Sequence, residues 1–160
     1  MNNEVRPLAP VVRAGMLIRR TPEEVFQAFA DPEITTKFWF TKGSGFLVAG
    51  SKVQWDWEMY DVSAEIDVIE LIPNERIVFE WPGAHGTTQV RWKFIPLDNI
   101  GTFVSVENDG FAGTDAEVVE EAMGATQGFT IVLCAAKIYL EQGVEPNFVL
   151  DRFPKGITGG

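Results

Sequence analysis

Hydrophobic and small residues recur every three or four positions between Thr114 and Gln142, which is the spacing of one face of an α-helix. Thr114 and Glu117 have the spacing of a capping box, in which each side chain accepts a backbone N–H of the other residue. Gly143 marks the end of the pattern. We therefore expect one long C-terminal helix. Its stripe consists of Val118, Ala122, Ala125, Phe129, Val132, Ala136 and Tyr139.

A second apolar stripe lies on the later half of this helix and consists of Ile131, Ala135 and Ile138. One covering surface would leave it wet, so either the short helices earlier in the chain or a second subunit covers it. Gly124 and Gly128 each cost about 1 kcal/mol relative to alanine in a helix interior. Either a close backbone approach or room for a ligand would explain these two glycines.

Alternation of apolar and polar residues predicts β-strands through the middle of the chain. In the first clear case, Val53, Trp55, Trp57 and Met59 point one way and the polar residues between them point the other. The same alternation, interrupted by turn residues, covers 62–72, 77–81, 88–94 and 102–108. A glycine-rich loop before the series contains one candidate short strand, residues 46–48. Short connections make consecutive strands antiparallel neighbours, with one dry and one wet face.

The N-terminal part of the chain predicts a strand over 11–20 followed by two short helices. Thr21-Pro22 is typical of a helix start, and the second helix runs from about Pro32 to Trp39. About six or seven strands, two short helices and one long helix form an α+β layout in which the long helix covers the dry face of the sheet. We expect one domain over 1–160, with a core over 11–143 and a C-terminal extension over 144–160.

The composition is that of a soluble globular protein, because 46% of the 160 residues are hydrophobic and 22% are charged. No apolar run approaches the length of a membrane span. The first ten residues lack the apolar segment of a secretory signal, and the single cysteine cannot form an internal disulfide. These features favour a cytoplasmic location. The formal charge of −10 disfavours binding to nucleic acid.

Several short motifs follow one another in a familiar order. They are Thr21-Pro22-Glu23-Glu24-Val25-Phe26, Ala30-Asp31-Pro32, Phe38-Trp39, ELIPNERIVFEW over 70–81, Gly101-Thr102, Gly110-Phe111, Gly128-Phe129, Lys137 and YLEQG over 139–143. Together they resemble the SRPBCC superfamily of START domains and the birch-pollen allergen, and within it the branch of the activator of the heat-shock-protein-90 ATPase. The resemblance covers roughly 11–143 and implies the helix-grip fold, a curved antiparallel sheet with the C-terminal helix over its concave face.

Two positions depart from the family pattern. Members often have tryptophan after the glycine of the long helix, where this chain has Phe129, and histidine near the end of the last strand, where it has Asn108. Both positions lie toward the cavity in such folds, so the ligand of a relative does not transfer to this chain.

No catalytic constellation is indicated by the sequence. His85 is the only histidine and lies in a Pro/Gly loop, where a turn histidine is expected. Cys134 lies in the long helix among apolar neighbours and is expected to act as a small hydrophobic residue. A metal site needs three or four converging ligands, so we expect no metal. The glycines at 43, 45 and 50 lack the spacing of a phosphate-binding loop, and we expect no cofactor.

A concentration of aromatic residues is the remaining candidate site, and these rings form either an ordinary core or the wall of a ligand cavity. The resemblance favours a cavity, because in similar proteins the gap between sheet and helix commonly holds an apolar small molecule. Buried indole N–H groups would also offer polar points inside it. The candidate ligand-binding residues are Trp39, Trp55, Trp57, Trp81, Trp92, Asn108, Thr126, Phe129 and Thr130.

Three functions remain open. The first is non-catalytic binding of a small apolar or aromatic molecule between the sheet and the long helix. The second is a cochaperone-like role with a chaperone as partner, which the resemblance implies. The third is an enzyme acting on an aromatic or polyketide-like substrate, which requires an acid or base inside the cavity.

The apolar extension suggests one further partner. Phe148, Val149, Leu150 and Phe153 make it apolar enough to dock on its own domain or on a neighbour. A homodimer through this extension, or through Ile131, Ala135 and Ile138, is therefore a further expectation.

Overall fold

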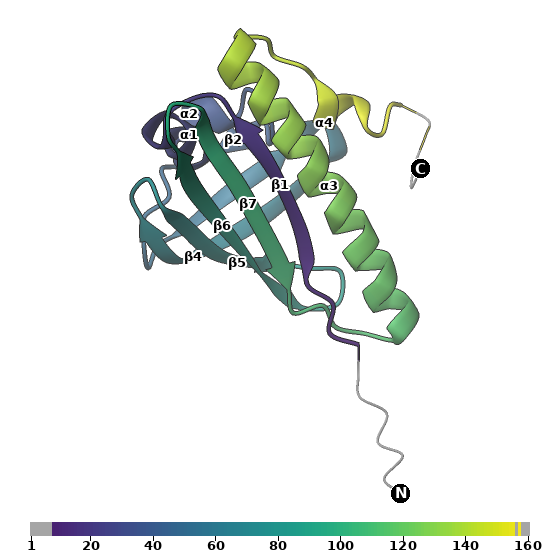
Figure 1. Cartoon of the computed structure of the whole chain (residues 1–160). Helices are drawn as coiled ribbons and strands as arrows, with labels where there is room; N and C mark the ends of the chain where they lie inside the picture. The colour runs from purple at the N-terminus through teal and green to yellow at the C-terminus, as the bar shows by residue number, and fades with distance from the viewer. Residues whose placement is uncertain (1–7, 156, 158–160) are drawn as a thin grey trace, which may run out of the picture.

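The computed structural model describes residues 8–155 and residue 157. Seven antiparallel strands form one curved sheet in the order β1-β7-β6-β5-β4-β3-β2, and the long helix α3 lies beside β1 (Figure 1). The predicted α+β helix-grip fold is confirmed. The strands are β1 (Val12–Ile18), β2 (Lys42–Gly43), β3 (Lys52–Trp57), β4 (Val62–Ile72), β5 (Arg76–Pro82), β6 (Thr87–Leu97) and β7 (Gly101–Asp109). The helices are α1 (Pro22–Ala30), α2 (Pro32–Thr35), α3 (Asp115–Gln142) and α4 (Phe148–Asp151), with a short 3-10 turn at Glu58–Tyr60.

The inner face of the sheet carries the alternation that the sequence predicts. In β6 and β7 every second residue is buried, and the register places Trp92 opposite Val106 and Phe94 opposite Val104. Because the side-chain period of a strand is two, a slip by one residue would turn this whole apolar set toward water. The apolar pattern therefore fixes which face of the sheet α3 can cover.

Two local predictions in the region between β1 and β3 are wrong. The second short helix ends at Thr35, and the chain continues as turns to Trp39. The buried Thr35 hydroxyl contacts the carbonyls of Ala28 and Asp31. Residues 46–48 form no strand, and only Leu47 is buried, with its N–H donating to Ala30. The short strand lies instead at Lys42–Gly43, which pairs with β3.

Both ends of α3 have the predicted capping. The Thr114 hydroxyl accepts the N–H of Glu117, and the Glu117 carboxylate accepts the N–H of Thr114 at 2.9 Å. Gly143 ends the helix in the left-handed conformation with φ of 69°, and its N–H donates to Tyr139. The boundaries of α3 are therefore set by local side chains.

The N-terminal half of α3 is tied to the loop between β5 and β6. The Glu121 carboxylate accepts the N–H of Ala84 at 2.9 Å, and His85 Nε2 lies 3.1 Å from a carboxylate oxygen of Glu117. The backbone N–H and the hydroxyl of Thr114 lower the pKa of Glu117, and His85 makes a smaller contribution in the same direction. These contacts hold the first turns of α3 against the far end of the sheet.

The C-terminal half of α3 is tied to β1 through a partly buried charge pair. The Lys137 ammonium donates to the carbonyl of Leu17 at 2.7 Å and to Glu141 at 2.6 Å. The same Glu141 oxygen accepts the N–H of Arg19 at 2.8 Å, and Arg20 donates to the Glu141 carbonyl. Burial opposes ionisation of Glu141, but the Arg19 N–H and Lys137 outweigh it and lower the pKa of Glu141.

The C-terminal extension folds back on its own chain. After Gly143 the chain reverses and α4 lies against α3 (Figure 1). Ile131 borders hollows shared with residues of this extension, Ala135 is completely buried and Ile138 is half-buried. Ala135 is thus covered within the chain, whereas Ile131 and Ile138 are partly exposed, and their cover by a second subunit stays a prediction.

One helix in the described part of the chain, α3, is long and apolar enough by length and composition to cross a membrane. This differs from the expectation that no run approaches that length. The apolar stripe of α3 is buried in the domain, with Val118, Phe129 and Val132 each 3% exposed. The helix is therefore the core helix of this α+β fold.

The contacts of Lys137 and Glu141 with Leu17 and Arg19, called here the α3–β1 clamp, give a prediction about stability in acid. Because the pKa of Glu141 is lowered in the folded state, its contribution is present above the unfolded pKa of about 4.3 and is lost as the pH falls through the folded value. We expect Glu141→Gln to lower the free energy of unfolding at neutral pH by about 1–2 kcal/mol. The difference in free energy of unfolding between the variant and the native protein should become smaller in acid. Urea denaturation at several pH values measures both quantities.

The matched control for this clamp is Glu120→Gln. Glu120 lies on the exposed side of the same helix, and its substitution makes the same charge change without touching β1. If the free energies of unfolding of the Glu141→Gln protein and the native protein differ by the same amount at every pH, the clamp does not depend on the ionised Glu141 carboxylate.

The two glycines inside α3 give a second prediction. A Cβ built on Gly124 or Gly128 meets no heavy atom within 4 Å, so no close backbone approach requires either glycine. Gly124→Ala and Gly128→Ala should each raise the free energy of unfolding by about 1 kcal/mol, because alanine restricts the unfolded chain. Urea denaturation of the two variants measures this gain. A loss of stability in either variant would show a constraint at that position.

Candidate functional site

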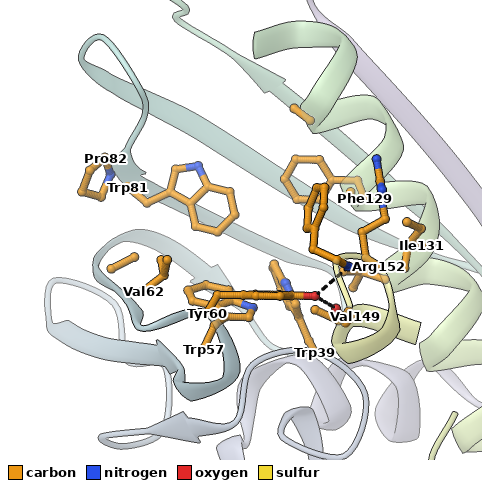
Figure 2. A pocket seen from close by; sticks show the side chains of 15 residues that line it. Trp39, Trp57, Tyr60, Val62, Trp81, Pro82, Phe129, Ile131, Val149 and Arg152 are labelled. Atoms are coloured by element: carbon orange, nitrogen blue, oxygen red, sulfur yellow. Dashed lines mark hydrogen bonds between the residues drawn. The ribbon is translucent and has the colours of Figure 1, made fainter. Parts of the chain in front are cut away.

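A cavity of about 380 Å³ lies between the inner face of the sheet, the middle of α3 and the C-terminal extension. Figure 2 shows its walls, with aromatic rings on the sheet side and the extension on the opposite side. Its position matches the space that the sequence predicts beneath the long helix. The lining residues are Trp39, Trp57, Tyr60, Val62, Ala64, Trp81, Pro82, Ala125, Gly128, Phe129, Ile131, Val132, Val149, Arg152 and Phe153.

Four aromatic residues predicted for the site meet at this cavity. Phe129 of α3 stacks on Trp81 of β5 with ring centroids 5.9 Å apart and an interplanar angle of 25°. Trp39 packs edge-on against both of them at 6.1 and 6.4 Å. Trp57 lies 6.4 Å from Trp81 and completes the aromatic wall. The turn after α2, two strands and the long helix each supply part of this wall.

Trp55 and Trp92 do not line the cavity. Each is 1% exposed and lies in the layer behind the cavity wall, where Trp55 stacks on Phe40 at 4.3 Å and Trp92 packs on Phe29 at 4.6 Å. Their contacts with Trp39 support that ring from behind. The period of two correctly places both residues on the inner face, but it does not indicate how close to the open space each one lies.

The three predicted polar residues also lie outside this cavity. Asn108 is buried and donates to Thr88 and to the Gln89 carbonyl at 2.8 Å, so its amide is satisfied within the sheet. The Thr126 and Thr130 hydroxyls donate to the carbonyl four residues earlier in α3 and face outward. Thr130 borders a separate open hollow of about 330 Å³.

Residues of the C-terminal extension form one wall of the cavity, and the sequence did not place them there. The Tyr60 hydroxyl lies against the carbonyl of Val149 (Figure 2). It also contacts the carbonyl of Leu150 and accepts the N–H of Phe153 at 3.2 Å. The Phe153 ring packs on the Tyr60 ring with centroids 5.9 Å apart. Tyr60 therefore holds the extension over the cavity. The apolar character of residues 148–153 was the available signal, but it did not identify the docking surface.

The α3 side of the cavity is lined by small and aliphatic residues. Gly128 and Ala125 leave the space that larger side chains would occupy, and Ile131 and Val132 complete this wall. Of the two earlier explanations for Gly128, the close backbone approach is not observed. The open space beside Gly128 is the space of the cavity itself.

The cavity wall contains no carboxylate, histidine, lysine or cysteine. His85 lies at the β5–β6 loop beside Glu117, and Cys134 borders the separate hollow with Thr130. Within the described residues no group of three or more His, Cys, Asp or Glu side chains could hold a metal ion. The arrangement can therefore surround an apolar molecule with aromatic faces, but it supplies no positioned acid–base pair.

Comparison with known proteins adds the family. Residues 19–141 match the family described as Activator of Hsp90 ATPase homolog 1-like protein. Among curated proteins no match was found. Protein SSP2350 from Staphylococcus saprophyticus is 30% identical, with a TM-score of 0.73 over 84% of this chain and 94% of that protein.

Two less similar structures share the fold. Protein MLL2253 from Mesorhizobium loti is 18% identical, with a TM-score of 0.73 over 84% of this chain and 99% of that one. The Aha1 dimer from Colwellia psychrerythraea is 22% identical, with a TM-score of 0.70 over 84% of this chain and 98% of that one. The family match covers most of the domain, including the aromatic wall and α3. The chain thus belongs to the family of Activator of Hsp90 ATPase homolog 1-like proteins, in the SRPBCC superfamily.

Proposed function

We propose that this protein binds a small apolar or aromatic molecule in the cavity beneath α3, without chemical conversion. The observation that carries this proposal is the cavity itself, about 380 Å³ in volume and walled by Trp39, Trp57, Trp81 and Phe129. Ligand sites of soluble proteins usually have volumes of about 300–1,000 Å³ and mostly apolar walls. The volume and the lining both fall within that class.

The rings that border this space are less buried than the core rings behind them. Aromatic rings without neighbouring protein atoms on one side lose dispersion contacts there. Trp57 and Trp81 are only partly buried although they lie on the inner face of the sheet. A bound apolar molecule would restore contacts to these rings and remove their surface from water.

A chaperone-related role is the second candidate, and family membership is the observation that favours it. The Colwellia relative is described as an Aha1 dimer, so a homodimer of this chain is part of the same proposal. Stimulation of the ATPase of a purified Hsp90 tests the chaperone role, and light scattering tests the dimer. A monomer that leaves the ATPase rate unchanged would count against both.

An enzyme acting on an aromatic substrate receives less support. That alternative needs a positioned acid or base in the cavity. Among the 15 lining residues, Tyr60 and Arg152 are the only ones with ionisable side chains, and the Tyr60 hydroxyl is engaged by the backbone of the extension. We therefore propose binding without chemistry as the primary function.

Filling the cavity from α3 tests the binding function. We expect Gly128→Leu to weaken binding of the neutral apolar probe N-phenyl-1-naphthylamine at least tenfold, because the new side chain occupies the space beside Trp81. Probe fluorescence measures the affinity. Gly124→Leu is the matched control, since Gly124 lies one turn earlier on the same helix, outside the cavity, with open space around it. Equal affinities of the two variants would refute a probe site in this cavity.

Removing the Tyr60 hydroxyl tests how the extension is held at the cavity. Tyr60→Phe removes the hydroxyl that bonds to the backbone of residues 149–153, and loss of about 1 kcal/mol there should raise the population of the opened extension about fivefold. Trypsin cleavage after Arg152, followed by mass spectrometry, measures this opening. Tyr139→Phe is the control, because the Tyr139 hydroxyl makes no hydrogen bond to the described residues. Equal cleavage rates in the two variants would contradict the role given to Tyr60.

A further inference from the structure

Arg152 is the one charged side chain in the cavity wall, as far as the structure describes the chain. It comes from the turn after α4, and it borders both the cavity and the neighbouring hollow. The remainder of the wall is apolar except for Tyr60 and the indole N–H groups of Trp39, Trp57 and Trp81, which are neutral, so Arg152 is the one positive charge available to a polar group of a ligand. The charge of Arg152 makes that place suitable for an anion.

The guanidinium of Arg152 makes two contacts within the described chain, and neither is to a carboxylate. It donates to the side-chain carbonyl of Gln127 on α3 and lies 4.2 Å from the ring centroid of Phe153. An arginine has five N–H donors in a planar fork, so donors remain for a second partner. The neutral partners hold the group in position without cancelling its charge.

Four other arginines of the described chain are paired with a carboxylate, whereas the side chains of Arg19 and Arg152 are not. Arg13, Arg20, Arg76 and Arg91 all have a carboxylate oxygen within 4 Å, the pair of Arg91 with Asp109 being bidentate. The chain has 23 acidic residues and 13 basic ones, so carboxylates are plentiful. At Arg152 no carboxylate lies within ion-pair distance among the described residues, and the residue borders a cavity whose wall has no acidic residue.

We infer that the ligand of this cavity is an apolar anion: a small, flat hydrophobic body with one acidic group that pairs with Arg152. The body lies against the rings of Trp81 and Phe129, and the anionic group lies at the edge of the cavity, where the guanidinium can bind two of its oxygens. This inference rests on the proposed binding function and adds the charge of the ligand to it. It also assigns the selecting residue to the C-terminal extension.

A pair of fluorescent probes that differ in one group tests this inference. 1-Anilinonaphthalene-8-sulfonate and N-phenyl-1-naphthylamine share the same aromatic body, and only the first carries a sulfonate. We expect the native protein to prefer the sulfonate and Arg152→Gln to weaken its affinity about tenfold, while the neutral probe binds both proteins equally. Arg152→Lys, which keeps the charge but loses the planar fork, should recover part of the loss.

Lys155→Gln is the matched control, because it removes one positive charge from the same exposed extension outside the cavity. It should leave the affinity for both probes unchanged. Circular dichroism and amide hydrogen exchange of residues 149–153 in each variant detect a loss of fold or of docking of the extension.

The outcomes separate the two levels of the proposal. If Arg152→Gln and Lys155→Gln weaken sulfonate binding equally, or if Arg152→Gln weakens both probes equally, the inferred pairing with Arg152 is wrong and the cavity remains a neutral apolar site. If Gly128→Leu leaves the affinity for the neutral probe unchanged, the cavity is not the site and the proposed function itself fails.

Discussion

The structure depends on how α3 is held against the sheet. The helix is fixed near its start by Glu121 on the Ala84 N–H and near its end by Lys137 and Glu141 on β1. Between these attachments its inner side carries Ala125 and Gly128, which are too small to fill the distance to the sheet. A helix that is fixed at both ends cannot bend far enough toward the sheet to fill that gap, because bending would break its backbone hydrogen bonds. The cavity is therefore a consequence of where the helix is anchored and where its side chains are small.

The aromatic rings limit the size of this gap. Phe129 stacks on Trp81, and Trp39 contacts both rings, so the sheet and the helix meet on one side of the cavity. Behind them Trp55 and Trp92 are fully buried and keep the wall rigid. Trp92 Nε1 has no hydrogen-bond partner among the described residues, a cost that the packing of the large rings outweighs. Rigid aromatic walls favour a flat ligand, because little side-chain entropy is lost when it binds.

The C-terminal extension gives the cavity its remaining wall and its charge. Tyr60 holds residues 149–153 in place through backbone groups, and Arg152 and Phe153 then line the cavity. Arg152 lies on the side opposite Trp81 (Figure 2). The family match ends at residue 141, before this extension begins. This wall of the cavity therefore lies outside the part of the chain that the family model matches.

Local patterns in the sequence determined the elements and their order. The capping box at Thr114, the glycine at Gly143 and the period of two in β6 and β7 depend on near neighbours along the chain, so the ends of α3 and the inner face of the sheet could be predicted. The same reasoning assigned Trp39, Trp57, Trp81 and Phe129 to the interior. Only the tertiary structure decided that these four border the cavity while Trp55 and Trp92 lie behind it, because that depends on the distance between sheet and helix. It also decided the places of Tyr60 and Arg152, since docking of the extension is a contact between segments about 90 residues apart that no local period encodes.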